Sequence, residues 1–242
     1  MKKDTIKEII LEDRGKFYGC SRETFFKEGT TFKHRETMDG KNILYVTKLF
    51  NRHFITTGKE VISKLTEISD QGGKVLTLTE LEEILPAFEI EENYPHFLYH
   101  KDAIAPGPLP DGYEIRKADP SVHKPLQEFL DSCNEEDIED ALIDLDDPDE
   151  EIRLVFSGEK PIGYAGYRRW GKEMGDVGIL IHHEHRKKGL GRAAVAAATE
   201  ACIKNKVLPF YRTCSENIGS ETIARSLGYE FEWVTTECKC SL

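Results

Sequence analysis

The sequence predicts an α/β fold, with a mixed central sheet flanked by helices in the C-terminal half and a smaller α/β domain before it. Three observations predict this class. Apolar segments of strand length alternate with helical segments beyond residue 112. The segment APGPLPDG, residues 105–112, contains three prolines and two glycines, which disfavour both helix and sheet. The composition, 39% hydrophobic and 10% aromatic over 242 residues, is sufficient for a buried core.

These boundaries give a domain at 1–104, a linker at 105–112 and a second domain at 113–242. In the first domain we expect a strand at 43–50, a helix at 59–69, and a short helix opened by a capping box, Thr79-x-x-Glu82. In the second domain the expected elements are, in order, a strand at 113–116, a helical stretch from 122 towards 145, a hairpin of 153–156 and 162–168, a buried strand at 177–181, a helix at 190–205, a strand at 208–214, a helix at 220–227 and a strand at 229–234.

Charge and hydropathy exclude several classes of protein. A net charge of −11 disfavours nonspecific nucleic-acid binding and attachment to anionic membranes, so neither nucleic acid nor membrane is an expected partner. The longest purely apolar run is six residues, 193–198, which is too short to span a bilayer. The first fourteen residues mix both charge signs and have no sustained apolar core, so we expect no secretory signal and a cytoplasmic protein.

Cysteines and histidines give no metal signal. The six cysteines include no C-x-x-C pair, and we expect reduced thiols, with Cys238 and Cys240 in a frayed tail. His182, His183 and His185 form a cluster after a strand, but successive strand residues point to opposite faces. We therefore expect no metal cofactor.

Acidic residues gather between Glu128 and Glu151, where thirteen Asp and Glu occur without one Lys or Arg. This stretch is either a solvated surface or a negative wall that attracts a cationic substrate.

The most informative segment is 176–199, where a buried strand leads through a basic, glycine-containing loop into an alanine-rich helix. The unpaired N–H groups at a helix start carry partial positive charge, and glycines let a loop direct several of them at one phosphate. The loop contains no P-loop string. Gly189-x-Gly191-x-x-Ala194 fits a dinucleotide pattern, but only 51 residues follow Gly191, too few for that fold. The remaining pattern is Arg186-x-x-Gly189-x-Gly191.

This pattern, after a strand and opening a helix, resembles the acyl-CoA loop of the GNAT acyltransferase superfamily. The segment from Asn217 through Ser220, Ala224 and Gly228 resembles the GNAT segment of an Asn-led short helix followed by a final strand. The resemblance covers residues 111–234 and extends to two-part GNAT proteins, in which a degenerate N-terminal half precedes a complete one. It implies a fold with a GNAT-like mixed sheet.

The resemblance also implies a site for acetyl-CoA as co-substrate. Backbone amides of the loop would hold the pyrophosphate and Arg186 would steady it; the loop residues are Lys187, Lys188, Gly189, Leu190, Gly191 and Arg192. The strand edge at Ile179 and Ile181 would pair with pantetheine, and Asn217 and Ser220 would contact it.

The chemistry requires a base for the amine and an acid for the leaving thiolate. Asp176 and Glu173, at the start of the central strand, are the candidate bases. Many GNAT enzymes place the acid tyrosine where this chain has Ala224, so Tyr211, Ser215 or water are the candidates here.

The predicted function is an N-acetyltransferase that moves an acetyl group from acetyl-CoA to a primary amine on a small molecule or peptide, with a cationic acceptor favoured. A catalytically inactive acyl-CoA sensor or interaction protein is the alternative, favoured by Ala224. A homodimer is compatible with either.

Overall fold

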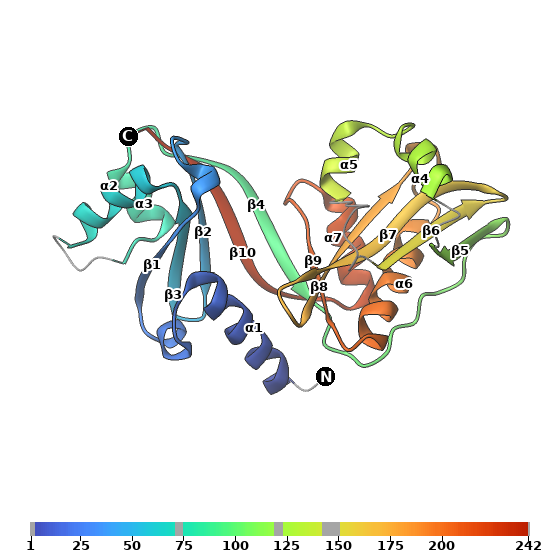
Figure 1. Ribbon diagram of the computed structural model, residues 1–242, viewed down its shortest axis with the longest axis horizontal. Coiled ribbons are helices and arrows are strands. Elements are labelled where there is room, and N and C mark those ends of the chain that lie inside the picture. The colour runs from blue at the N-terminus through green and yellow to red at the C-terminus, as the bar shows by residue number, and fades with distance from the viewer. Residues whose placement is uncertain (1–2, 71–74, 119–122, 142–150, 242) are drawn as a thin grey trace. The chain divides into compact units, whose positions relative to one another are not determined.

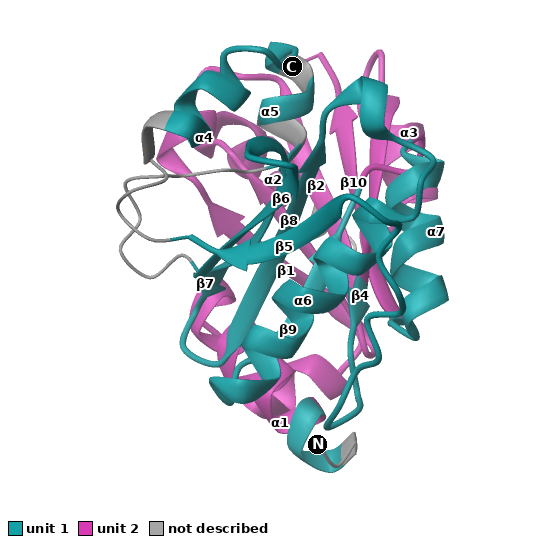
Figure 2. Ribbon diagram, turned by 90° about the vertical axis from the view of Figure 1, so that its right-hand side faces the viewer, with its two compact units in different colours: residues 1–6, 97–213, 217–230 teal, residues 7–96, 214–216, 231–242 magenta. Residues whose placement is uncertain are grey.

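The computed structural model describes residues 3–70, 75–118, 123–141 and 151–241. The chain forms two compact units (Figure 2): unit 1 comprises residues 1–6, 97–213 and 217–230, and unit 2 comprises residues 7–96, 214–216 and 231–242. The predicted α/β class with a mixed, helix-flanked sheet is confirmed. The predicted domains 1–104 and 113–242 stay a prediction; the compact units have different bounds, because the last strand continues past Glu230 into unit 2.

The strands of unit 2 lie side by side in the order β1-β3-β2-β10-β4. Its strands are β1 (Gly29–His34), β2 (Ile43–Leu49), β3 (Arg52–Thr57), β10 (Glu230–Lys239) and β4 (Glu89–Leu98), the last two being shared with unit 1 at one end. Its helices are α1 (Lys3–Tyr18), whose residues up to Ile6 belong to unit 1, α2 (Lys59–Asp70) and α3 (Leu78–Ile84), with 3-10 turns at Arg22–Phe26 and Glu36–Met38. Strand β1 is parallel to β3, whereas β2 is antiparallel to β3 and β10.

Two expectations for unit 2 were wrong in detail. The capping box is formed by Thr77 and Glu80: the Thr77 hydroxyl accepts from Glu80 N at 3.4 Å, and Thr77 N donates to the Glu80 carboxylate at 3.2 Å. Thr79 and Glu82 have the same spacing but lie inside α3. Cys238 and Cys240 are buried in the core of unit 2 beside Leu44 rather than in a frayed tail, because Cys238 pairs with Leu44 across β10 and β2.

Unit 1 contains the predicted elements from the strand at 113–116 to the helix at 220–227, but the helical stretch expected from residue 122 is two helices within the described residues, and the expected last strand lies mostly in unit 2. Its strands are β5 (Tyr113–Lys117), β6 (Glu151–Ser157), β7 (Lys160–Trp170), β8 (Met174–Ile181) and β9 (Leu208–Arg212), in the order β9-β8-β7-β6-β5. Strands β5 to β8 form an antiparallel ladder, and β8 is parallel to β9. Its helices are α4 (His123–Leu130), α5 (Glu135–Ala141), α6 (Leu190–Lys204) and α7 (Ile218–Leu227). Residues 103–110 form neither helix nor strand.

Helices cover both faces of the unit 1 sheet (Figure 1). Val177 and Ile181 of β8 are buried in one cluster with α6 and α7, whereas Leu180 is buried in the other with α4 and α5. This alternation is what a strand covered on both sides requires. Helix α6 packs on the sheet through small side chains, including Ala194 and Ala198, both fully buried. A carbonyl of α5 also lies directly over β8: a Cβ added at Gly178 would be 2.2 Å from Ala141 O, so only glycine fits there.

None of the helices in the described ranges is long and apolar enough to cross a membrane.

Candidate functional site

The central feature of unit 1 is a separation of two adjacent strands. Strand β8 pairs with β7 along its whole length, from Met174 to Ile181. It pairs with β9 only over Met174–Asp176, opposite Leu208–Phe210, although both strands continue. Beyond Asp176, the edge of β8 that faces β9 therefore has no strand partner in the described part of unit 1.

The direction of the backbone groups identifies which residues face this opening. His182 N donates to Ile162 O, towards β7, whereas Leu208 N of the β9 side donates to Glu173 O. Because successive strand residues alternate, Val177, Ile179 and Ile181 direct their N–H and C=O groups to the β9 side. The sequence-predicted residues Ile179 and Ile181 are thus placed on the open edge.

The loop after β8 presents a row of backbone donors. A 3-10 turn, His183–His185, leads to Lys187 (φ 63°) and to Gly189 (φ 81°), which is the N-cap of α6. Leu190, 1% exposed, anchors the helix start. Over the described ranges of the chain, none of the N–H groups of residues 187–192 has an acceptor; the first intrahelical bond is from Ala193 N to Gly189 O. These six donors lie at the positive end of a 15-residue helix.

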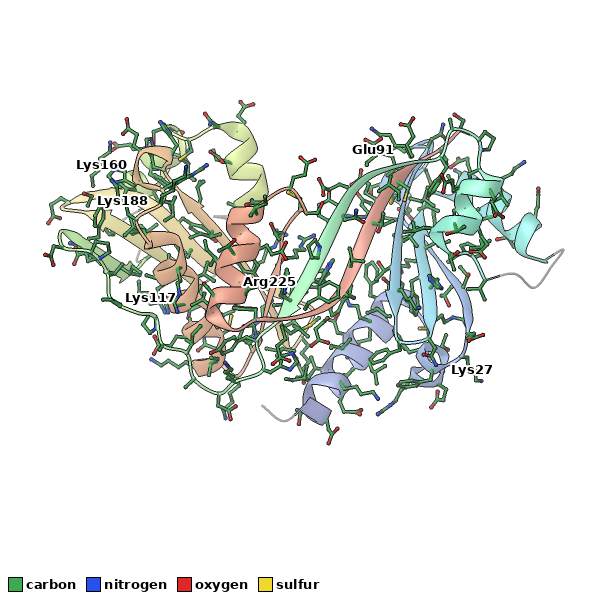
Figure 3. All side chains as sticks on the ribbon, turned by 180° about the vertical axis from the view of Figure 1, so that it is seen from behind. Lys27, Glu91, Lys117, Lys160, Lys188 and Arg225 are labelled. Carbon is green, nitrogen blue, oxygen red and sulfur yellow. The ribbon has the colours of Figure 1, made fainter. Side chains whose placement is uncertain are left out.

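Three of the four basic side chains of the loop, those of Arg186, Lys188 and Arg192, bind the protein itself. Arg186 donates from Nε to Ile181 O at 2.9 Å, and its Nη2 is 2.7 Å from Asp137 Oδ2 of α5. Lys188 donates to the Tyr113 hydroxyl at 3.2 Å, and Arg192 donates to Pro106 O at 3.0 Å. The side chains therefore fix the loop, and its backbone is left for a ligand. Lys188 and Lys160 both lie at this end of unit 1 (Figure 3).

Asn217 and Ser220 occupy the start of α7. The Asn217 side-chain oxygen accepts from Ser220 N at 3.0 Å, which makes Asn217 the N-cap. Ala224, at the position of the usual tyrosine, is fully buried. The capping role of Asn217 is therefore established, whereas its contact with pantetheine stays a prediction.

Tyr211 of β9 is 1% exposed and lies on the α6 side of the sheet. Burial raises the pKa of Tyr211 to about 12, with the Ser220 hydrogen bond opposing that rise and the charge of Asp176 adding to it. Tyr211 is consequently a neutral phenol, able to donate a hydrogen bond, throughout the neutral range. Ser215 is held in unit 2, where its hydroxyl donates to Glu92 at 2.7 Å.

The two candidate bases have different environments. Asp176 is 5% exposed, and its Oδ2 accepts from Nε and Nη2 of Arg212 at 3.3 and 3.2 Å. Glu173 is exposed in the β7–β8 turn. Sequence reasoning missed Arg212, although Phe210 and Arg212 alternate with the buried Tyr211 and so share one face of β9. Among the described residues, no group of three His, Cys, Asp or Glu is placed to hold a metal.

Comparison with known proteins agrees with this geometry. Residues 110–229 match the model of the acetyltransferase (GNAT) family. A GCN5-related N-acetyltransferase from Kribbella flavida is 20% identical with a TM-score of 0.51, covering 68% of this chain and 63% of its own. A GNAT-family acetyltransferase from Colwellia psychrerythraea is 14% identical with a TM-score of 0.53, covering 79% and 77%.

A GCN5-related N-acetyltransferase-like protein from Streptococcus suis is 13% identical with a TM-score of 0.51, and the match covers 89% of this chain and 81% of that one. At these identities the likeness shows the fold. The chain spans less than two thirds of the length of the Kribbella protein. No curated protein matches this chain.

Proposed function

This chain belongs to the GNAT superfamily through residues 110–229, and we propose that it transfers an acetyl group from acetyl-CoA to a primary amine. The observation that carries the proposal is the row of six unpaired backbone donors at 187–192 beside the open edge of β8, both within the described residues. A row of N–H groups at a helix start fits a pyrophosphate, and an open strand edge fits the amides of pantetheine.

The residues present fit acetyl-CoA, which supplies an activated acyl thioester. Gly189 at φ 81° lets the chain turn so that the amides of residues 187–192 converge. Ile181 O is taken by Arg186, so among the described residues Ile181 N and both backbone groups of Ile179 remain for the co-substrate. An N–H of this edge would also stabilise the oxyanion formed during transfer.

We assign Asp176 as the base and Tyr211 as the hydrogen-bond donor to the leaving group. We assign Asp176, whose Oδ2 is paired with Arg212, to accept a proton from the amine, directly or through water. Tyr211 donates a hydrogen bond to the leaving thiolate. Its pKa of about 12 lies well above that of a thiol, so the role of Tyr211 is to stabilise the thiolate by a hydrogen bond, and the thiolate takes its proton from water.

The acceptor is a primary amine, and the acid-rich stretch from Glu128 to Glu151 favours a cationic one. Nine of its residues, 142–150, lie outside the described ranges. Within it, Asp137 has a separate role, since it is paired with Arg186 of the loop.

One observation favours a second function. Ala224 stands where many GNAT enzymes have their tyrosine, which favours an acyl-CoA sensor without catalysis. Release of free thiol from acetyl-CoA across a panel of amines, with the acetylated product identified by mass spectrometry, separates the two functions. Transfer to any amine supports the enzyme. Saturable acetyl-CoA binding with no transfer supports the sensor.

A further inference from the structure

A polar cluster lies on the face of the unit 1 sheet that α4 and α5 share. Arg168 of β7 is directly opposite Asp176 of β8, so the two side chains are neighbours on one face. Phe210 of β9 pairs with Asp176 on the other side, and Arg212, two residues on, has the same orientation as Phe210. Asp176 is therefore flanked by one arginine from each neighbouring strand.

Arg212 is fixed at one end and accessible at the other. Its Nε and Nη2 both donate to Asp176 Oδ2, and its guanidinium carbon is 5.1 Å from the ring centroid of Trp170. The Trp170 ring in turn contacts Phe210 edge-on, with centroids 4.4 Å apart. The side chain of Arg212 is nevertheless 31% exposed, against 4% for Asp176, and its Nη1 has no acceptor among the described residues.

The charges of this cluster do not cancel. Arg168 is half-buried and forms no ion pair with a described residue, so two guanidinium groups stand against one carboxylate. Two forked cations with spare donors on one face attract a planar anion, and a carboxylate matches their geometry.

The position of the cluster relates it to transfer. Asp176 is the last residue of β8 that pairs with β9, and Ile179 on the open edge lies three residues further, about 10 Å along the strand. An acceptor that places its amine at this edge and an anionic group at the arginines therefore holds the two groups up to about 10 Å apart, roughly the length of nine bonds in an extended chain.

On the proposed function, we infer that the acceptor is an amino acid, whose carboxylate Arg168 and Arg212 bind while its amine is directed to the thioester. The acid-rich stretch and the arginines then act on different parts of one zwitterion. If the arginines serve only to hold Asp176, acceptors with and without a carboxylate are used equally.

The test compares amino acids of increasing separation between amine and carboxylate, from α-amino acids to long-chain ω-amino acids, with their own carboxamides as acceptors. We expect kcat/KM to favour the best amino acid over its amide by at least about 10-fold, since charge-assisted hydrogen bonds are stronger than neutral ones. Arg168→Gln, which leaves the Asp176–Arg212 pair in place, should lower that ratio about 10-fold with little change for the amide. Arg212→Lys keeps the positive charge but loses the planar, forked set of donors, so it should lower the acid-to-amide ratio of kcat/KM only partially. Arg169→Gln changes the next residue on the opposite face and is the matched control.

A binding measurement keeps this inference separate from the proposed function. With the protein saturated in CoA, titration calorimetry compares an N-acetylamino acid with its N-acetyl amide. Tighter binding of the acid that Arg168→Gln abolishes supports the inference, even if no amine releases thiol and the proposed function fails. The inference is wrong if the wild type shows an acid-to-amide ratio near one in both kcat/KM and binding affinity. It is also wrong if Arg168→Gln leaves these ratios unchanged.

Discussion

Asp176 of β8 and Phe210 of β9 form the last pair between two parallel strands, and beyond them the strands separate. The same point on the sheet therefore begins the open edge of β8 and holds a buried carboxylate with its arginine partner. The strand edge proposed for the co-substrate and the carboxylate proposed as the base thus come from neighbouring residues of one strand.

The first prediction concerns Gly189. Replacement by alanine puts a side chain on a φ of 81° and at the centre of the donor row, so the variant should lose acetyl-CoA binding as well as stability. Acetyl-CoA at a hundred times its Kd should stabilise the wild type by about 2.7 kcal/mol, measured by thermal unfolding.

Gly112 provides the matched control. Its φ is 82°, and like Gly189 it has no atom within 4 Å of an added Cβ. Both alanine variants should lose about 1–2 kcal/mol from the left-handed backbone, whereas Gly112→Ala alone keeps the ligand shift. If acetyl-CoA stabilises Gly189→Ala as much as it stabilises the wild type, the loop is not part of the acetyl-CoA site.

The second prediction concerns the base. Asp176→Asn should lower kcat roughly 10²- to 10⁴-fold at neutral pH while acetyl-CoA affinity stays near the wild-type value. Glu173→Gln should cost less, because Glu173 is exposed in a turn whereas Asp176 is buried against Arg212. Steady-state kinetics on both single variants and on the double variant show which carboxylate acts as the base. Wild-type turnover in all three would place the base elsewhere.

The third prediction uses the pKa of Tyr211, which burial raises to about 12. A folded pKa above the unfolded value of about 10 gives stability that is complete below pH 10 and lost as the pH rises to 12. Tyr211→Phe should therefore flatten the fall in the free energy of unfolding over that interval. It should also lower kcat roughly 10²-fold if the phenol stabilises the thiolate. The free energy of unfolding is measured by denaturant titration at several pH values. If it falls between pH 10 and 12 as steeply in Tyr211→Phe as in the wild type, the buried environment assigned to Tyr211 is wrong.

The fourth prediction concerns the acid-rich stretch. Neutralising Glu135, Glu136, Glu139 and Asp140 together, with Asp137 kept because it binds Arg186, should lower kcat/KM for a cationic acceptor. The loss should shrink at high salt, since charges are screened over about 8 Å at physiological ionic strength. A loss that is independent of salt, or none, leaves the stretch as solvated surface.

Much of unit 1 could be predicted from local pattern. The buried run at 177–181, the basic loop and the alanine-rich helix each have a strong local cause, and Asn217 has the expected capping geometry. The local pattern predicts strands β8 and β10 to be shorter than they are. Residues 174–176 of β8, and Thr236 and Cys238 in the second half of β10, are strand residues because they pair with distant strands.

Other features depend on contacts that no local pattern contains. The strand separation after Asp176 and the Asp176–Arg212 pair arise from how β8 and β9 meet, and the two residues of the pair are 36 positions apart in sequence. Two T-x-x-E strings overlap at 77–82, and packing rather than spacing selects Thr77 as the cap. Strands β1, β3 and β4 and helix α1 were not predicted: charged residues interrupt the apolar ones in β4 and α1, and β1 and β3 are short strands with few large apolar residues.

The most direct measurement is hydrogen exchange of the backbone amides at 187–192, with and without acetyl-CoA. In the free protein these amides have no acceptor within the described residues and should exchange quickly. Acetyl-CoA should protect them together with Ile179 and Ile181, while the hairpin turn at Gly158 stays unchanged. Saturable binding of acetyl-CoA with no protection at 187–192 would contradict the site.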